Sequence, residues 1–248
     1  MKLHYVWVGG IVPEEVKKCL ASWAVYLPQF EICEWNETNI PKNDYVSQAL
    51  AIRNYAAVSN YVRAWALFEY GGLYLDTDVE ILDFRLGEYI RDSLNCDVLL
   101  GIESRDPFVV NNAVIFCRNH SSKLMNLVLR EFDSYDGKEP ANVSGPLLLT
   151  NVLKRHSYIN VVLLEPEVLY SYRWDRYYEE INKSAWLLHY GEATWIEALE
   201  IDFYIDGQIE YKKKYLVARK YIYDLEQGSL RFIFKSIKNL IIRKIYKK

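Results

Sequence analysis

The sequence predicts an α/β fold in which a mixed sheet is flanked by helices, and two observations carry this prediction. Short apolar runs typical of strands alternate along the chain with longer stretches whose apolar residues recur every three or four positions. The 248 residues are also 51% hydrophobic and contain no linker rich in Pro, Gly or Ser, so the chain can bury one substantial core. We therefore expect one main domain over residues 1–200 and a basic helical extension over residues 201–248.

Each expected strand is a short run of apolar or β-branched residues bounded by turn-forming or polar residues. The strands are expected over Leu3–Val8, Glu31–Trp35, Leu73–Leu75, Val79–Leu82, Asp97–Glu103, Val109–Phe116, Ile159–Leu164 and Ala185–His189. The run Asp97–Glu103 is almost continuously apolar, which indicates a strand covered on both faces. The helices are expected over Pro13–Leu27, Ala49–Gly72, Leu124–Phe132 and Leu147–Leu153.

The most informative stretch is Val58–Glu80, in which a helix, a turn, a strand and two carboxylates follow one another without a gap. Gly71 and Gly72 are expected to end the helix, because glycine takes a left-handed backbone conformation without steric cost. Asp76 and Asp78 follow the strand at alternate positions, which point to the same side of an extended backbone. The stretch therefore presents two close carboxylates at the end of a buried strand.

The two carboxylates indicate a metal site. Groups this close repel each other unless a positive charge lies between them. Oxygen ligands at the end of an α/β strand suit Mg²⁺ or Mn²⁺ that also contacts substrate phosphates. A solvated turn is the alternative, since an Asp-x-Asp arises by chance about once in a chain of this length. Asp76 and Asp78 are therefore candidate metal ligands whose support must come from the residues around them.

The surrounding residues match a longer motif. Its members are Ser59, Arg63, Gly71, Gly72, Tyr74, Asp76 and Asp78. In this segment the chain resembles the DXD-containing glycosyltransferases of family 32, which include bacterial polysaccharide enzymes, fungal mannosyltransferases and, more distantly, the glucosylating domains of large clostridial toxins. Asn60 departs from the motif, because the family usually has Asp at this position. Asn keeps an acceptor oxygen but loses the charge and gains two N–H donors, which leaves the identity of the sugar open.

The resemblance implies a GT-A type fold, a UDP-sugar donor and a Mn²⁺ or Mg²⁺ ion. The residues that it assigns to the donor are Trp7, Val8, Gly9, Ser59, Asn60, Tyr74, Asp76, Asn111 and Trp195. Trp7 would stack on the uracil, with a tryptophan packed in the core as the alternative. Asn111 lies in a segment similar to the family's Ile-Asn-x-Ala and is preferred to Asn112. A turn asparagine is the alternative there.

Three further positions gain a role through the resemblance. Arg63 could direct its planar set of donors at the diphosphate. The alternative is an arginine that is exposed to solvent on the helix and has no functional role. His189 resembles the family's closing histidine and would be a third metal ligand, although a lone histidine on an apolar strand is more often structural. Residues Ser144–Pro146 fit a capped helix start and also a family motif on the acceptor side of the cleft.

The C-terminal segment differs sharply in charge from the rest. Residues 212–248 contain twelve Lys and Arg against two acidic residues, a net charge of +10, while the preceding residues carry −13. Within this segment Ile233–Ile245 has apolar residues at helical steps between the basic ones. Such a helix binds an anionic membrane surface or docks on its own acidic domain, and the sequence leaves both open. Nucleic acid is not expected as a partner, because the main domain is acidic.

Together these features predict a metal-dependent glycosyltransferase that moves a hexose or N-acetylhexosamine from a UDP-sugar to a glycan acceptor. By resemblance the transfer is retaining and serves bacterial surface polysaccharide synthesis, with an acceptor that can be lipid-linked. Asp76, Asp78 and Arg63 are the candidate catalytic residues. A non-catalytic nucleotide-sugar-binding domain and a toxin-like protein glucosyltransferase are the alternatives. With no signal peptide and no long apolar run, the expected location is cytoplasmic or peripheral on the inner face of the plasma membrane.

Overall fold

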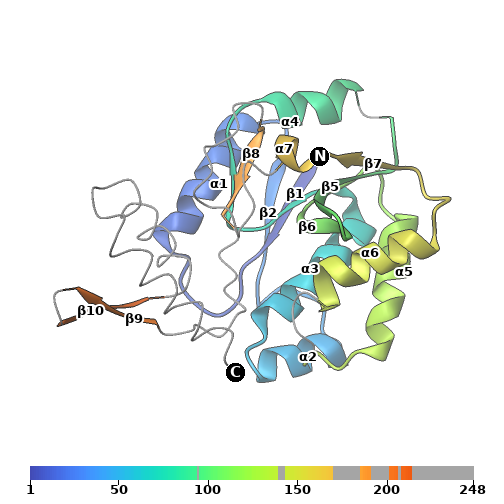
Figure 1. The fold of residues 1–248 in the computed structure, drawn as a ribbon. Helices are drawn as coiled ribbons and strands as arrows, with labels where there is room; N and C mark the ends of the chain where they lie inside the picture. Colours follow the sequence, from blue (N-terminus) through green and yellow to red (C-terminus); the bar gives the residue numbers. More distant parts are fainter. Residues whose placement is uncertain (94, 139–142, 170–184, 191–200, 206–207, 214–248) are drawn as a thin grey trace. The chain divides into compact units, whose positions relative to one another are not determined.

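The computed structural model describes residues 1–93, 95–138, 143–169, 185–190, 201–205 and 208–213. The chain divides into two units, of which the first comprises residues 1–173 and 181–191 and the second comprises the remaining residues. The helices that the structure describes all belong to the first unit (Figure 1). The domain boundary predicted between residues 200 and 201 stays a prediction, because residues 191–200 lie outside the described part.

The first unit is built on a six-stranded sheet with the order β2-β1-β3-β6-β5-β7. Its strands are β1 (Lys2–Val6), β2 (Glu31–Trp35), β3 (Gly72–Leu75), β5 (Val98–Arg105), β6 (Phe108–Cys117) and β7 (Val161–Leu164). Only β6 runs antiparallel to its neighbours in this sheet, and the pairs β1–β2, β1–β3 and β5–β7 are parallel. The mixed sheet expected from the sequence is thereby confirmed. The carboxyl ends of β1, β3 and β5 consequently lie along one edge.

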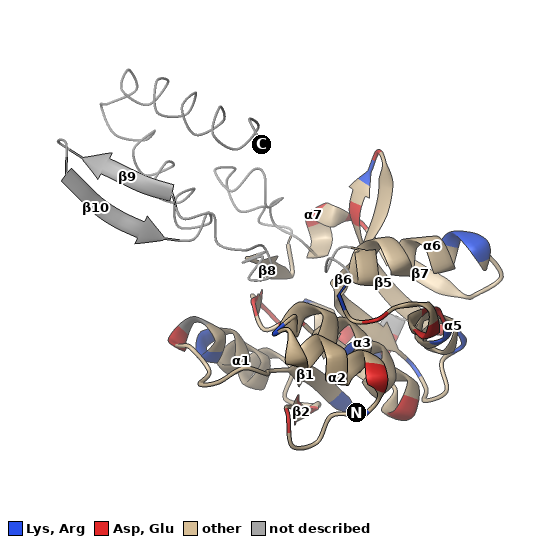
Figure 2. Cartoon of the chain, turned by 90° about the horizontal axis from the view of Figure 1, so that it is seen from below, with Lys and Arg blue, Asp and Glu red and all other residues tan. Residues whose placement is uncertain are grey.

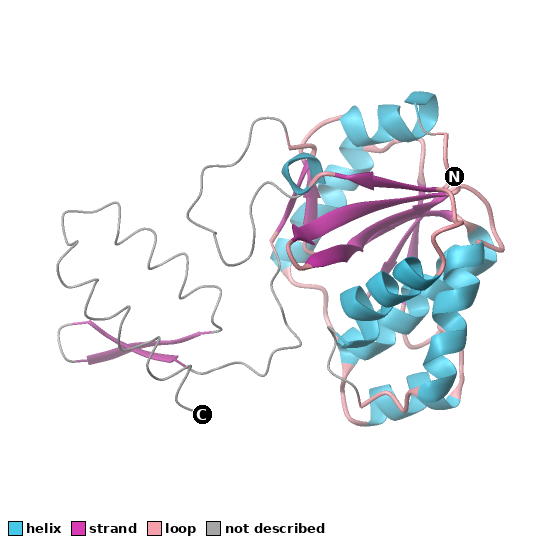
Figure 3. Ribbon diagram, turned by 45° about the vertical axis from the view of Figure 1, so that its right-hand side comes forward, coloured by secondary structure: helices cyan, strands magenta, loops and turns pink. Residues whose placement is uncertain are grey.

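Helices cover both faces of this sheet (Figure 3). They are α1 (Glu14–Tyr26), α2 (Asp44–Ala51), α3 (Tyr55–Tyr70), α4 (Arg85–Glu88), α5 (Lys123–Glu131), α6 (Leu148–Arg155) and α7 (Pro166–Leu169), with short irregular turns over Tyr89–Ser93, Phe132–Ser134 and Val143–Leu147. One core lies between the sheet and α2, α3, α5 and α6, and the other lies between the sheet and α1, α4 and α7. In β3, Tyr74 joins the first core while Leu73 and Leu75 join the second, as strand alternation requires. Basic and acidic residues are interspersed over these elements (Figure 2).

The long helix expected over Ala49–Gly72 is in fact two helices, α2 and α3. Arg53, between them, has a positive φ of 58°. The Asn54 side chain then accepts a hydrogen bond from the Ala57 N–H and caps α3. Asparagine is among the preferred capping residues, so a cap inside the apolar pattern starts a new helix. The prediction of one continuous helix was therefore wrong.

The junction between α3 and β3 brings two buried segments into close contact. Gly72 has a φ of 95°, and a side chain there would place Cβ 2.3 Å from the backbone oxygen of Lys2 in β1. His4, in β1, is fully buried, and its Nε2–H donates to the Gly71 oxygen at 2.9 Å while Nδ1 accepts from the Trp35 indole at 3.2 Å. Burial lowers the pKa of His4 to about 4, so this histidine is neutral in the folded protein.

Two small sheets complete the described structure. In the first unit, β4 (Val79–Ile81) pairs antiparallel with β8 (Leu187–His189), and Val79 lies opposite His189. In the second unit, β9 (Ile201–Ile205) and β10 (Gln208–Lys213) form an antiparallel pair. The expected helical extension thus begins with strands, and its predicted helix over Ile233–Ile245 lies outside the described residues. Within the described part, no helix combines the length and apolar character needed to cross a bilayer.

Candidate functional site

The two carboxylates lie on a tight turn at the end of β3. The Asp76 N–H donates to the Ala113 oxygen on β6 at 2.8 Å, and the Val79 N–H donates to the Asp76 oxygen at 3.0 Å. On the other side of the turn, the Tyr190 N–H donates to the Asp78 oxygen at 3.0 Å. The turn is therefore fixed by β6 and by the residue that follows β8.

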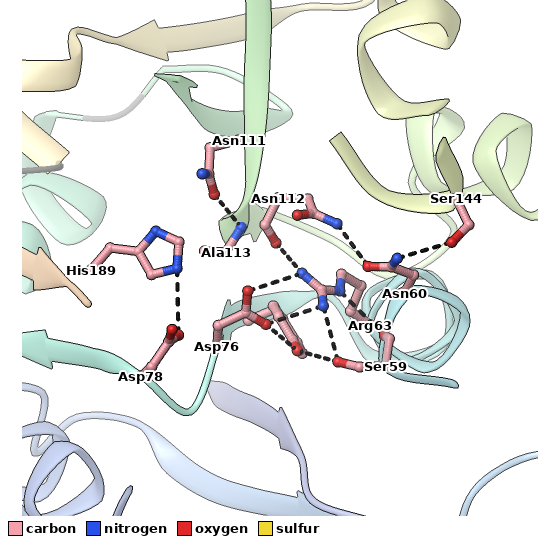
Figure 4. Close-up of polar contacts among 11 residues, drawn as sticks. Ser59, Asn60, Arg63, Asp76, Asp78, Asn111, Asn112, Ala113, Ser144 and His189 are labelled. Carbon is pink, nitrogen blue, oxygen red and sulfur yellow. Dashed lines mark hydrogen bonds and ion pairs between the residues drawn. The ribbon is translucent and has the colours of Figure 1, made fainter. Parts of the chain in front are cut away.

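Asp76, Asp78 and His189 converge on one point (Figure 4). One ligand atom from each of them lies within 4.8 Å of the other two. His189 Nε2 is 3.4 Å from Asp78 Oδ1, and the two side chains are 18% and 19% exposed. The β4–β8 pairing produces this contact, because it sets His189 opposite the residue that follows Asp78. The structure thus assembles the three residues that the sequence proposed as metal ligands.

The electric field at this point favours a positive charge. Burial by itself lowers the pKa of His189, but the contact with Asp78 and the charges of Asp76 and Glu103 outweigh it and raise that pKa. The same carboxylates that favour protonated His189 would also favour a cation in its place.

The three side chains fit a divalent metal ion by their chemistry. Two carboxylates and an imidazole are ligands that Mn²⁺ accepts, and Mg²⁺ prefers the oxygens. Two ligands on opposite sides of Mg²⁺ lie about 4.2 Å apart, which is twice the usual distance from the ion to a ligand atom. The three ligand atoms here lie within 4.8 Å of one another, which is close to that separation. Small side-chain movements would therefore suffice to hold the ion.

Arg63 occupies all of its donors with protein atoms rather than extending into open space. Its Nη1 reaches the Asn112 oxygen at 2.6 Å and Asp76 Oδ2 at 3.4 Å. Its Nη2 reaches Ser59 Oγ at 2.9 Å and Asp76 Oδ1 at 3.1 Å, and Nε donates to the Ser59 oxygen at 3.2 Å. The guanidinium therefore contacts both oxygens of the Asp76 carboxylate. Its predicted contact with a diphosphate stays a prediction.

Tyr74 and Ser59 complete the support of Asp76. The Tyr74 hydroxyl donates to Asp76 Oδ1 at 2.8 Å and is 2.9 Å from Ser59 Oγ. The Arg63 guanidinium also lies 4.6 Å from the centre of the Tyr74 ring. Burial raises the pKa of Tyr74 well above its usual range, so the hydroxyl stays protonated and can donate. Of these two predicted donor contacts, Tyr74 therefore binds Asp76 directly, and Ser59 contacts Tyr74 and Arg63.

A second chain of buried polar contacts lies beside the clamp that Arg63 and Tyr74 form on Asp76. Asn112 Nδ2 donates to Asn60 Oδ1 at 2.9 Å, and Asn60 Nδ2 lies 3.1 Å from Ser144 Oγ. All three residues are buried. Gly145 packs so closely that an added Cβ would be 2.8 Å from the Asn112 amide. The Ser144 hydroxyl faces Asn60, and the N-cap position of α6 is Leu147. Ser144 therefore does not cap this helix.

The expected nucleotide contacts at the end of β1 lie along the same sheet edge. Trp7 is partly buried, and its indole N–H donates to the Gly10 oxygen at 2.9 Å. Val8 is buried in the first core, and the Gly9 N–H donates to Glu37 Oε1 at 2.7 Å. The roles of these residues at a nucleotide stay predictions. Trp195 lies outside the described residues.

Glu103 is the residue near the site that the sequence reasoning did not single out. Its Oε2 is 3.3 Å from Asn111 Nδ2, and Asn111 Oδ1 accepts the Ala113 N–H at 2.6 Å. The available signal was its place at the end of an apolar strand, the same signal that identified Asp76. Asn112, placed second to Asn111 from the sequence, supplies the carbonyl oxygen that Arg63 contacts.

The chain is similar to known proteins in part of its length. Residues 13–84 match the family described as glycosyltransferase sugar-binding region containing DXD motif. Human lactosylceramide 4-alpha-galactosyltransferase is 33% identical over 140 residues, which are 50% of this chain and 36% of that protein. The mouse enzyme of the same name is also 33% identical over 140 residues, 50% of this chain and 35% of its own. The chain thus spans about a third of the length of these relatives.

A solved structure shows the same fold. The PaToxG glycosyltransferase superposes with a TM-score of 0.50 at 18% identity, covering 62% of this chain and 69% of the other. The fold of the first unit is of the GT-A type. The matched residues 13–84 include Arg63, Asp76 and Asp78, so the resemblance seen in the sequence is confirmed over this segment.

Proposed function

We propose that this chain transfers a hexose or N-acetylhexosamine from a UDP-sugar to a glycan acceptor, with Mn²⁺ or Mg²⁺ held by Asp76, Asp78 and His189. The convergence of these three side chains within 4.8 Å carries the proposal. Galactose is the foremost candidate sugar, because the curated relatives are named as galactosyltransferases. Their names also specify an alpha product, which from an α-linked UDP-sugar corresponds to retention at the anomeric carbon.

The chain's own residues have distinct parts in this proposal. The acceptor oxygen bonds to the anomeric carbon, the bond from that carbon to the diphosphate breaks, and its electron pair leaves with UDP. The proton of the acceptor hydroxyl passes to a phosphate oxygen of the departing UDP. The ion would offset the negative charge that develops on the departing diphosphate. Arg63 and Tyr74 hold Asp76 in one orientation before substrate arrives, which is the preorganisation that such stabilisation requires.

The setting of the reaction forms the finer part of the proposal. A lipid-linked acceptor of a bacterial surface polysaccharide, reached at the cytoplasmic face of the plasma membrane, would explain the net charge of +10 over residues 212–248. A basic segment would concentrate the enzyme on an anionic surface.

UDP release tests the reaction directly. UDP-galactose, UDP-glucose and UDP-N-acetylglucosamine are supplied with p-nitrophenyl β-galactoside, β-lactoside or N-acetyl-β-glucosaminide, with Mn²⁺, Mg²⁺ or EDTA. We expect release with at least one donor, abolished by EDTA and restored by Mn²⁺. Release that persists after complete chelation would remove the metal from the proposal. Metal-dependent binding of UDP without turnover would instead identify a nucleotide-sugar-binding domain.

A further inference from the structure

We propose that Glu103 binds a hydroxyl group of the acceptor sugar and so contributes to the choice of acceptor. This inference rests on the proposed glycosyl transfer and adds to it a residue on the acceptor side. Glu103 lies near the carboxyl end of β5, at the sheet edge where β3 delivers Asp76 and Asp78.

A β-bulge directs the Glu103 side chain. Ile102 pairs with Val110 and Ser104 pairs with Val109, so Glu103 is the additional residue on β5 between two paired positions. Bulges interrupt strand alternation and re-aim a side chain, and they occur often beside active sites. Glu103 is half-buried, although the strand before it is buried throughout.

Asn111 holds the carboxylate in place. The Asn111 Oδ1 accepts the Ala113 N–H, which fixes the amide so that its Nδ2 faces Glu103. The next residues of β6 connect this pair to the site, because the Ala113 oxygen accepts the Asp76 N–H.

The chemistry of the site favours a sugar hydroxyl over a metal ion or a diphosphate as the group that Glu103 binds. Glu103 is not among the residues whose ligand atoms converge, so it does not complete the metal site in this arrangement. A carboxylate repels a diphosphate, which disfavours that part of the donor. Sugar hydroxyls donate strong, charge-assisted hydrogen bonds to carboxylates. Arg105, its neighbour on the strand, binds Glu165 and Glu167 instead.

Steady-state kinetics of Glu103→Gln test the inference. The assay uses the donor and aryl glycoside that wild type turns over fastest, and Glu165→Gln on the nearby exposed ion pair is the matched control. Because a hydrogen bond to a charged group is lost, we expect the acceptor KM to rise about tenfold or more in Glu103→Gln. The donor KM and the slow hydrolysis of donor by water should stay within about twofold of wild type, and Glu103→Asp should recover part of the loss.

Two results would overturn the inference. An acceptor KM equal to that of wild type would show that Glu103 does not contact the acceptor. A donor KM or Mn²⁺ requirement that rises as much as the acceptor KM would assign Glu103 to the donor or the metal. Both differ from failure of the proposed function, in which wild type itself releases no UDP. Unchanged melting temperatures of the variants confirm that the comparison concerns folded proteins.

Discussion

The two carboxylates of one turn have very different surroundings. Asp76 is held by Arg63 and Tyr74, which contact both of its oxygens and come from α3 and β3 directly before it. Asp78 contacts His189, which reaches it from β8 far along the chain. Asp76 is therefore fixed by a buried clamp, whereas the position of Asp78 depends on a long-range strand pair. The difference suggests that Asp76 orients substrate and that Asp78 has more freedom to coordinate the ion.

Neutralising either carboxylate should have the largest effect on activity. The two variants should differ from each other in stability. We expect Asp76→Asn and Asp78→Asn each to lower kcat/KM about a thousandfold, because an amide binds a divalent cation poorly. Asp76→Asn should also destabilise the fold by about 1–3 kcal/mol, since it leaves the buried Arg63 without its carboxylate. Urea unfolding measures this loss of stability, and Asp92→Asn, at an exposed residue, serves as the control. Equal stability of the two variants would contradict the comparison.

Removing the clamp itself should have the next largest effect. Arg63→Met keeps the bulk of the side chain but removes five donors, so we expect a loss of about a hundredfold in kcat and about 2 kcal/mol in stability. Arg63→Lys should recover little, because lysine cannot bridge Ser59, Asn112 and Asp76 together. Arg91→Met, on an exposed ion pair, is the matched control. Full activity in Arg63→Lys would show that charge alone matters.

Changing His189, the partner of Asp78, should alter the metal requirement of the reaction. His189→Ala should raise the Mn²⁺ concentration for half-maximal activity about tenfold to a hundredfold, the range seen when support of a metal site is lost. The requirement for Mg²⁺ should change less, because imidazole suits Mn²⁺ better than Mg²⁺. The clamp stays intact, so kcat at saturating metal should fall little. His120→Ala, at an exposed histidine, is the control, and an unchanged Mn²⁺ requirement would return His189 to a structural role.

The smallest expected effect is a pH dependence of stability that comes from His4, the buried histidine outside the candidate site. His4 has a folded-state pKa of about 4, below the ordinary value of 6.5, so between these values the unfolded chain binds a proton that the folded protein does not. Its contribution to stability is complete above pH 6.5 and should have fallen by about 2 kcal/mol at pH 5. Urea unfolding at pH 7, 6 and 5 measures it. His4→Asn should flatten the slope, and an unchanged slope would place the titration elsewhere.

The sequence was sufficient to predict those features that depend on a pattern of a few neighbouring residues. Gly71 and Gly72, the β3 strand and the two carboxylates follow from propensities and alternation within a few residues, and the structure has them where expected. The division between α2 and α3 was missed, because the apolar stripe hid the capping role of Asn54. His189 was proposed through a resemblance, and its contact with Asp78 comes from the β4–β8 pair.

The sequence by itself determined the fold class and the DXD turn with its two close carboxylates, because these depend on side-chain type and short-range geometry. The tertiary structure decided what each polar residue faces. It directed Arg63 to Asp76, joined Asn60 to Asn112 and Ser144, and brought Glu103 beside Asn111. These contacts depend on strand order and bulges in the sheet, which bring together residues from distant segments. No local pattern encodes that order, since it is set by how the whole core packs.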